Sequence, residues 1–498
     1  MRPSRGQPAP LSAQAATHPS RFAVEAALDG KFVDRVRAVC PDVVQTDQER
    51  VDAGRDWWPL SAVWAVAGTV PALPAAVARP READQVAAVL RLCHDARIPV
   101  TPVAGASGVC GGSVPVFGGI SLDLTGLDGI IEVDDHSMLV DVRAGTFGEE
   151  LEASLRSGPG LTLGHWPQSM ALSTVGGWIA CRSAGQYSTR YGKVEDMVVG
   201  LEVALADGRL VRTGGTAPRA ATGPDLTQLF VGSEGTLGVI TAAKLRSRPQ
   251  PLAERTAAYA FDDFGRGLDA CRRILRRGAT PAVLRLYDHS ESARNFEVET
   301  GAALIVIDEG DPALIDAVMA VVSDECRDAG RLAGDLPGRW IEHRNQVPPV
   351  ESLVRAGIVA DTVEVSGSWS VLPRLYASAI AALKEVPGTM AASAHQSHAY
   401  TDGGCLYFTF AGRPDSGTAA AEAYYRQAFD AVMTATMGCG GAISHHHGIG
   451  LNRGRYMRDY LGPAFGVLAA TKTALDPHGI LNPGKLGLPS SFGAVWED

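Results

Sequence analysis

The hydrophobic and polar positions of the chain follow two different periods, which predicts a mixture of helices and strands. From Val77 onward a short apolar run precedes Val86, Val89 and Leu90, which lie at helical spacing. A second apolar run then enters a glycine-rich loop. We therefore expect a strand, a helix and a strand in this order.

Three later segments have the pattern of strands. They read "SMLVDVRAG", "DMVVGLEVALADGRLVRT" and "GVITAAKLRSRP". Asp207-Gly208 separates two alternating apolar runs, which is a strong signal for a hairpin. Together with the opening strand and helix, these segments predict one α+β domain over residues 77–248.

The rest of the chain divides into further regions. Residues 249–435 alternate helical pieces with strands such as "CLYFTFAG", which predicts a second α+β domain. Residues 436–498 contain a last helix over residues 464–475. Residues 23–76 are predicted to be mostly helical. Residues 1–22 are free of acidic side chains, and we expect a disordered leader there, although a transit peptide has the same composition.

Composition and charge exclude several classes of protein. The chain has 498 residues and a net charge of −10 without a basic cluster, which argues against nucleic-acid binding. No apolar run is long enough to span a membrane. The eight cysteines contain no C-x-x-C pair, so neither a disulfide framework nor a zinc ribbon is indicated. We expect a cytoplasmic protein that acts on a small molecule.

Glycines cluster in three stretches of the first predicted domain. The stretches are "PVAGASGVCGGS", "STVGGWIACRSAGQYSTRYG" and "GSEGTLGVIT". Closely spaced glycines let backbone N–H groups converge on an anion and let a flat ring approach the main chain. None of the three is the G-x-G-x-x-G of a Rossmann fold, but together they indicate a dinucleotide site.

Several segments carry a resemblance to a known family. They include "GHWPQSMALSTVGGWIACRSAGQYSTRYGKVEDMVVGLEV", "TGPDLTQLFVGSEGTLGVIT", "GGCLYFTFAG", "SHHHGIG" and "LDPHGILNPGKL". Over roughly residues 45–490 the chain resembles the FAD-linked oxidases of vanillyl-alcohol oxidase type, and within them the alkyldihydroxyacetonephosphate synthase branch. The resemblance implies an α+β fold with an FAD-binding domain of two subdomains, of p-cresol methylhydroxylase (PCMH) type, over residues 77–248. It also implies a cap domain over residues 249–435 and a carboxyl-terminal segment that returns to the flavin.

The resemblance further implies which residues line the FAD. Relatives with covalently bound flavin often attach it to a histidine in the first loop, and this loop has none here, so we expect dissociable FAD. The implied residues are Ala104, Gly105, Ala106, Ser107, Gly108, Pro167, Gln168, Ser169, Thr174, Gly176, Gly177, Arg182, Ser183, Gly185, Tyr191, Glu234, Gly235, Thr236, Gly238 and Ile240. A homodimer is also expected.

The synthase branch uses flavin without net oxidation. Its flavin N5 bonds to the substrate carbon that loses a fatty acid from acyl-dihydroxyacetone phosphate, and a fatty alcohol then takes the flavin's place. Such chemistry needs a group that removes and returns a proton. The matched catalytic residues are Tyr407, His445, His446, His447, His165 and Arg285.

Three of these residues also have a plainer interpretation. Tyr407 lies in an alternating strand, where a tyrosine is commonly a packing residue. His165 could cap a turn before Pro167, and Arg285 could form an ion pair within the cap domain.

We expect no bound metal. Metal-dependent 2-hydroxy-acid dehydrogenases of the wider superfamily bind a divalent ion through His, His and Glu, and His446 stands in the place of the Glu. By this resemblance Tyr407 stands in the place of the second His, which leaves His398 as the main standard ligand. In an extended segment, His445 and His447 would share one side and His446 the other, so the run by itself cannot form a compact metal triad.

Two departures from the synthase pattern leave the reaction open. Val350 stands where the branch has an arginine that faces the flavin, and Arg355 follows five residues later. Ala104 and Ala106 replace residues that are usually glycine, which disfavours positive φ. Three functions therefore remain: a redox-neutral synthase, an FAD oxidoreductase of an alcohol, amine or 2-hydroxy acid, and a scaffold without catalysis.

The carboxyl-terminal residues "AVWED" are no peroxisomal signal, so a bacterial setting is expected.

Overall fold

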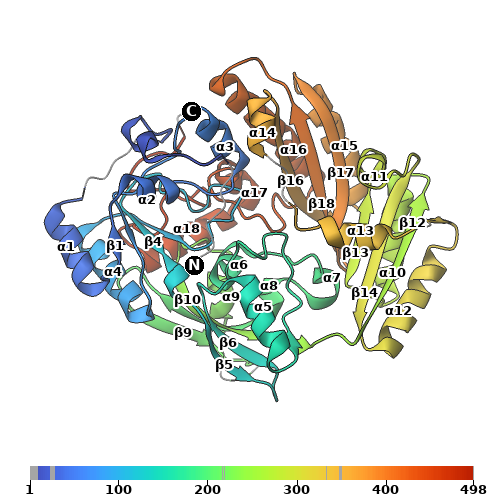
Figure 1. Cartoon of the computed structure of the whole chain (residues 1–498), viewed down its shortest axis with the longest axis horizontal. Helices are drawn as coiled ribbons and strands as arrows, with labels where there is room; N and C mark the ends of the chain where they lie inside the picture. The colour runs from blue at the N-terminus through green and yellow to red at the C-terminus, as the bar shows by residue number, and fades with distance from the viewer. Residues whose placement is uncertain are drawn as a thin grey trace.

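The computed structural model describes residues 9–22, 28–215, 217, 219–332, 334–346 and 350–496. Figure 1 shows a first domain, drawn in blue and green, beside a second domain drawn in yellow and orange. The carboxyl-terminal segment, drawn in red, returns to the first domain, where Leu481 bridges to Val100. This arrangement confirms the expected α+β fold.

The first subdomain contains a four-stranded sheet in the order β1-β2-β4-β3. Its strands are β1 (Val43–Val44), β2 (Ala76–Ala78), β3 (Val100–Val103) and β4 (Ile120–Asp123). The expected strand, helix and strand are β2, α4 (Ala83–Ala96) and β3. β2 and β3 are both parallel to β4, because the helical crossover returns the chain in the same direction.

The second subdomain contains a five-stranded antiparallel sheet in the order β5-β6-β10-β8-β9. The predicted hairpin at Asp207-Gly208 joins β8 to β9, and Gly208 has a φ of +81°, which the turn requires. The strands are β5 (Ile130–Asp134), β6 (Leu139–Arg143), β8 (Val198–Ala204), β9 (Leu210–Gly214) and β10 (Val239–Arg246), and the helices are α5 (Gly148–Ser157), α6 (Val175–Cys181), α7 (Ser188–Tyr191), α8 (Val194–Met197) and α9 (Leu226–Phe230).

The cap domain is built on a seven-stranded antiparallel sheet in the order β15-β12-β14-β13-β17-β18-β16. Its strands are β12 (Ala253–Phe261), β13 (Val283–Tyr287), β14 (Ala302–Gly310), β15 (Gly330–Arg331), β16 (Val359–Ser368), β17 (Thr389–Ala399) and β18 (Gly403–Gly412). Its helices are α10 (Phe264–Arg276), α11 (His289–Phe296), α12 (Pro312–Glu325), α13 (Leu336–His343), α14 (Val350–Arg355), α15 (Leu372–Glu385) and α16 (Thr418–Cys439).

One face of the cap sheet is apolar and the other is polar. Leu406, Phe408 and Phe410 of β18 are fully buried in one hydrophobic core with residues of α10, α12, α15 and α16. Because side chains alternate along a strand, Cys405 and Tyr407 point to the opposite face. That face lies toward the first domain, whose α7 contacts β13 and β17.

The amino-terminal residues differ from the expected disordered leader. Residues 1–8 lie outside the described part of the chain, but Phe22 packs edge-on against Trp64 and Trp496 with ring centroids 5.7 and 5.2 Å apart. Arg21 forms an ion pair of 2.9 Å with Glu422. Composition alone could not indicate this packing, because the partners lie far along the sequence.

The remaining elements connect these layers. The expected last helix is α18 (Ala464–Leu475). No helix within the described ranges is long and apolar enough to cross a membrane. The other elements are η1 (Ala13–Thr17), α1 (Gly30–Val39), α2 (Asp47–Asp52), α3 (Pro59–Val66), η2 (Leu124–Gly126), β7 (Leu161–Thr162), β11 (Arg248–Pro249), η3 (Gly454–Tyr456) and α17 (Met457–Leu461).

Candidate active site

A row of polar side chains crosses the polar face of the cap sheet. Tyr407 on β18 is paired directly with Glu364 on β16 and with His395 on β17. His395 is in turn paired with Tyr287 on β13, two residues after Arg285. Directly paired residues of antiparallel strands point to the same face. The register of the sheet therefore brings Arg285, His395, Tyr407 and Glu364 onto the surface that faces the first domain.

The hydroxyl group of Tyr407 lies in a short chain of polar groups. Its oxygen lies 3.4 Å from Nε2 of His447 and accepts a hydrogen bond of 3.1 Å from Oγ1 of Thr362. The phenol ring stacks between the rings of His395 and His446, at centroid distances of 4.9 and 5.9 Å. Burial raises the pKa of Tyr407 above its usual value, so the phenol is neutral at neutral pH.

Glu364 shapes the loop that carries the three histidines. Its side chain is fully buried and forms an ion pair of 3.0 Å with Arg453. Its carboxylate accepts hydrogen bonds from the backbone N–H groups of His445, His446 and His447 at 2.9, 3.3 and 2.5 Å. Burial opposes ionisation, but the charge of Arg453 and the hydrogen bonds from Arg453 and the backbone of His445 outweigh it and lower the pKa of Glu364.

The histidine run forms bends, whereas we expected it to be extended. The bends let Nδ1 of His445 and Nδ1 of His446 approach to 3.0 Å, although an extended chain would point them apart. Nδ1 of His447 lies 3.7 Å from Oε1 of Glu364. Burial lowers the pKa of His447 to about 4 and those of His445 and His446 well below their usual value. All three imidazoles are therefore neutral at neutral pH.

Arg285 is held by an imidazole and carboxylate pair. Nη2 of Arg285 lies 2.6 Å from Nε2 of His395, whose Nδ1 lies 2.7 Å from Oε2 of the buried Glu291 on α11. The guanidinium also lies 5.6 Å from the ring of Trp340. The Nε of Arg285 is buried without a hydrogen-bond partner, which leaves the group able to bind an anion.

Sequence reasoning did not single out His395, Glu291 or Glu364. His395 and His398 stand three residues apart in "SAHQSH", and Glu364 is an isolated acid within the apolar strand "TVEVSG". The sequence did contain one sign of a functional role, namely a charged or imidazole side chain inside an otherwise apolar strand. It could not say which partners these residues meet across the sheet.

His165 lies apart from this row. Its Nε2 lies 2.8 Å from Oγ of Ser183, and its ring lies 4.7 Å from that of Trp178. Burial lowers the pKa of His165 to about 3. None of its contacts with described residues involves Tyr407 or the histidine run.

The glycines of the three loops leave room for a flat ligand. The backbones of two loops touch, because a Cβ added to Gly105 would lie 2.0 Å from the carbonyl oxygen of Leu172. By contrast, a Cβ on Gly108, Gly112 or Gly177 would meet no atom closer than 3.3 Å. The loops thus combine close packing with open glycine faces, which fits a dinucleotide.

Backbone strain and unpaired polar atoms also gather at these loops. Ala106, Arg182 and Glu234 have φ values of +52°, +54° and +49°, a region that costs about 1–2 kcal/mol for a residue with a Cβ. Ala106 therefore adopts the positive φ that alanine disfavours, and the loop keeps its conformation at this cost. Buried Oδ2 of Asp56 and Oγ of Ser233 have no hydrogen-bond partner, and they can receive the hydroxyl groups of FAD.

Several of the residues expected to bind the cofactor also contact other parts of the protein. Glu234 accepts hydrogen bonds from the backbone of Ile449 at 2.6 Å and Gly450 at 2.8 Å, which ties the loop after the histidine run to the first domain. The Tyr191 hydroxyl donates to Glu309 of the cap domain at 2.7 Å. Gly238 packs within the core, because a Cβ there would lie 2.5 Å from Val203.

The position expected to hold an arginine is Val350, the first residue of α14. Arg355 is largely exposed and pairs with Glu351 on the same helix at 2.8 Å. A different cap-domain arginine reaches the first domain. Arg344 donates to Oε1 of Gln186 at 2.7 Å and lies 5.0 Å from the ring of Tyr187.

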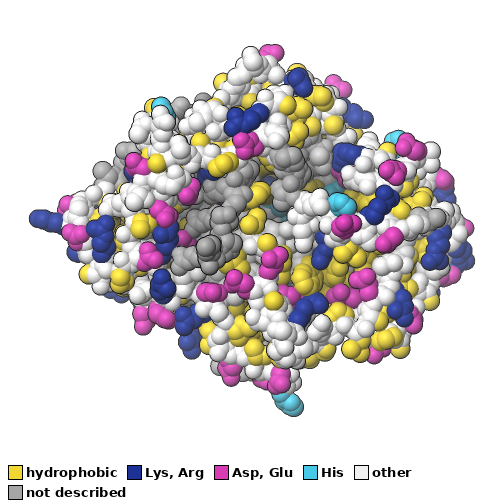
Figure 2. Space-filling model, in the orientation of Figure 1, with side chains coloured by type: hydrophobic (Ala, Val, Ile, Leu, Met, Phe, Trp, Pro, Cys, Tyr) yellow, Lys and Arg dark blue, Asp and Glu magenta, His cyan; other side chains and the backbone are white. Residues whose placement is uncertain are grey.

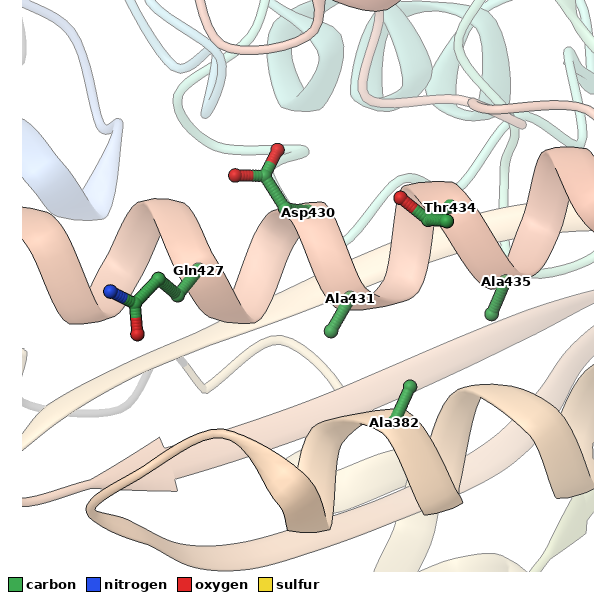
Figure 3. Close-up of a pocket in the computed structure, with 6 residues that line it drawn as sticks. All are labelled: Ala382, Gln427, Asp430, Ala431, Thr434 and Ala435. Carbon is green, nitrogen blue, oxygen red and sulfur yellow. The ribbon is translucent and has the colours of Figure 1, made fainter.

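Two cavities lie near the cap domain. A cavity of about 650 Å³ opens beside the histidine run and is lined by His445, Tyr400, Lys193 and Gly404 among others. A second, of about 440 Å³, lies between α15 and α16 (Figure 3). These two helices pack on the apolar face of the sheet, opposite to Tyr407. On the face shown in Figure 2, Lys and Arg side chains are interspersed with Asp and Glu.

Comparison with known proteins agrees with this geometry. Residues 74–214 match the family described as FAD binding domain, and residues 250–486 match FAD linked oxidases, C-terminal domain. The fold and the glycine-rich loops thus define an FAD-dependent enzyme, and the chain belongs to the FAD-linked oxidase family.

The chain is 32% identical to the uncharacterized FAD-linked oxidoreductase YgcU of Escherichia coli K12, over 83% of this chain and 89% of that protein. It is 28% identical to alkyldihydroxyacetonephosphate synthase of Dictyostelium discoideum, over 84% of this chain and 74% of that protein.

Two solved structures share the fold. A structure of alkyldihydroxyacetonephosphate synthase has a TM-score of 0.77 at 23% identity and covers 96% of this chain and 88% of its own. Substrate-bound p-cresol methylhydroxylase has a TM-score of 0.74 at 19% identity and covers 93% of this chain and 98% of its own. The fold is therefore of PCMH type.

Proposed function

We propose that the protein catalyses a redox-neutral substitution like that of alkyldihydroxyacetonephosphate synthase, on an acyl-dihydroxyacetone-phosphate-like substrate. In this reaction the C1–O bond to the acyl group breaks and a C1–O bond to an alkoxy group forms. The acyl group leaves as a carboxylate, and the proton of the alcohol is released. No electrons are gained or lost overall. Bound FAD would supply the isoalloxazine ring as the reactive partner of C1.

The observation that carries the proposal is the enclosed chain from Tyr407 through His447 to Glu364. Tyr407 can donate to Nε2 of His447, because Nδ1 of His447 faces the carboxylate of Glu364 and so favours the proton on that atom. Thr362 donates to the tyrosine oxygen and holds the hydroxyl in this direction. Tyr407, His447 and Glu364 thus form a relay that can hold or return one proton at the hydroxyl of Tyr407.

The relay ends inside the protein. Glu364 is fully buried, and its carboxylate is held by Arg453, by Ser444 at 3.0 Å and by the backbone of the histidine run. A proton taken from the substrate therefore stays close to it, as a reaction that returns the proton to the same carbon requires. An oxidation instead has to release its proton to solvent.

Arg285 supplies the anion-binding group of this proposal. Its guanidinium is held by His395, whose ring stacks on Tyr407, and its Nε has no hydrogen-bond partner. A guanidinium held in this way suits a phosphate, which accepts several hydrogen bonds at once. We assign it to the phosphate of the substrate.

An FAD oxidoreductase of an alcohol, amine or 2-hydroxy acid is the second candidate. It is favoured by Val350, because the arginine that faces the flavin in the synthase branch has no counterpart there and Arg355 pairs with Glu351. In this case His447 would accept the substrate hydroxyl proton through Tyr407.

Anaerobic flavin spectroscopy separates the two candidates. The purified holoenzyme is mixed with palmitoyl-dihydroxyacetone phosphate and hexadecanol, and separately with a panel of alcohols, amines and 2-hydroxy acids. Release of palmitate with an ether product and no lasting loss of flavin absorbance supports the synthase. Lasting bleaching by a panel member, without ether formation from the first mixture, overturns it in favour of oxidation.

A further inference from the structure

Four side chains with metal-ligand chemistry converge beside Tyr407. His398, Cys405, His445 and His446 each offer one donor atom, and these four atoms all lie within 4.8 Å of one another. The first three side chains are buried and His446 is half-buried. We propose that these residues bind one Zn²⁺ ion through three nitrogen atoms and one sulfur atom. The site goes beyond the proposed function and does not depend on it.

A bulge in β17 creates half of this group. Tyr407 is paired with His395, and Cys405, two residues earlier on β18, is paired with His398. The three-residue step on β17 is possible because the register shifts between Gln396 and His398. Without the bulge His398 would point into the apolar core, so the extra residue turns its side chain to the face of Cys405.

One ring nitrogen of His398 is buried without a hydrogen-bond partner. Its side chain is 4% exposed, and its Nδ1 lies 2.8 Å from Oγ of Ser397. Its Nε2 is buried and has no hydrogen-bond partner. A buried polar atom without a partner destabilises the fold, so an unpaired imidazole nitrogen beside a thiol and two further imidazoles requires an explanation. A metal ion would accept its lone pair.

His445 and His446 face each other in the geometry of two ligands. Their Nδ1 atoms are 3.0 Å apart, and two nitrogens on one tetrahedral zinc at about 2.0–2.1 Å would be roughly 3.3 Å apart. Nε2 of His445 lies 3.0 Å from the hydroxyl of Tyr400. Metal-binding histidines usually bond a second group through their other nitrogen, as His445 does with Tyr400 and His398 with Ser397.

Cys405 decides which metal the group suits. The expectation of no metal rested on the loss of the Glu and the second His of the hard-cation site, but a sulfur and a further imidazole fill the space instead. Thiolate and imidazole donors favour zinc, and four protein ligands leave no open position for substrate. The ion would therefore hold the histidine run in its bent form. The cavity of about 650 Å³ that His445 borders offers a path from solvent.

X-ray absorption at the zinc edge, together with elemental analysis, tests the site in the FAD-loaded full-length protein. After dialysis against micromolar zinc we expect about one ion per chain, with one sulfur at about 2.3 Å and three nitrogens at about 2.0–2.1 Å. The unmodified protein gives this result, so the test does not depend on a variant that folds. Flavin does not absorb at this edge.

Variants locate the ion. Cys405→Ser and His398→Ala should each lower the affinity for zinc by at least about 10–100-fold, with FAD content unchanged. Cys439→Ser, at a buried cysteine outside the group, should retain the wild-type zinc content. Absence of zinc from the wild-type protein, or bound zinc without a sulfur ligand, would overturn the proposal. So would full zinc binding by Cys405→Ser.

Discussion

Glu364 and Tyr407 are direct partners across the antiparallel strands β16 and β18, and both reach His447. The carboxylate lies 3.7 Å from Nδ1 of the imidazole, and the phenol oxygen lies 3.4 Å from its Nε2. The strand register places an acid and a phenol on the same face, and the bent loop inserts an imidazole between them.

Tyr407→Phe should lower turnover by about 10²–10⁴-fold, the usual contribution of general acid–base catalysis. The variant loses only the hydroxyl that contacts His447 and Thr362. FAD content and melting temperature should stay at the wild-type values. Tyr424→Phe removes a hydroxyl that contacts Thr389 on the edge of the cap domain and serves as the control. If Tyr407→Phe retains most of the activity, the tyrosine is a packing residue.

Glu364→Gln should destabilise the fold by about 3–5 kcal/mol, because it leaves the fully buried Arg453 without its counter-charge. Arg453 already has two buried nitrogens without partners. Urea unfolding measures the change. Glu351→Gln, which breaks the exposed pair with Arg355, should change the free energy of unfolding by less than about 1 kcal/mol. Equal effects of the two substitutions would contradict the assigned role of Glu364.

The protein should lose stability as the pH falls from about 6.5 toward 4. An unfolded imidazole takes up a proton near pH 6.5, whereas the pKa is lowered to about 3 in buried His165 and to about 4 in buried His447. In this range the unfolded state holds more protons, so each histidine contributes a loss of up to about 1.4 kcal/mol per pH unit.

His165→Gln should therefore reduce the slope of the free energy of unfolding against pH. The amide can keep a hydrogen bond to Ser183 and carries no titrating group. The matched control is His136→Gln, at an exposed position in the turn between β5 and β6. Urea unfolding at several pH values measures the slopes, and an unchanged slope in His165→Gln would refute the role of this histidine.

Ala106→Gly should leave stability unchanged or raise it by up to about 1 kcal/mol. Glycine removes the cost of a Cβ at a φ of +52°, although it adds conformational entropy to the unfolded chain. Ala88→Gly, inside helix α4, should instead destabilise by about 1 kcal/mol. Thermal unfolding with FAD bound compares the two. A clear loss of stability in Ala106→Gly would show that the methyl group is needed for packing.

FAD should be released by acid or heat without remaining attached to the chain. The first loop, residues 104–108, contains no histidine that could form a covalent link. Precipitation with acid followed by the absorbance of the supernatant measures the released fraction. Flavin that stays with the protein pellet and with a single peptide after digestion would disprove this prediction.

The sequence by itself determined the elements and much of the ligand chemistry. Apolar periodicity was sufficient for the order of β2, α4 and β3, for the hairpin at Asp207-Gly208 and for α18 (Ala464–Leu475), since these elements depend on residues close together in the chain. Clustered glycines indicated the dinucleotide loops for the same reason. The quoted segments were sufficient to indicate the family.

The tertiary structure alone decided which side chains meet. Glu364 and His395 lie beside Tyr407 because of strand register, and His398 reaches Cys405 because β17 contains a bulge. Neither feature has a local pattern, since a shift of one residue in either strand would turn these side chains to the other face. The bend of the histidine run depends on Glu364, a carboxylate some 80 positions away that binds its backbone, and no period in the sequence encodes that contact.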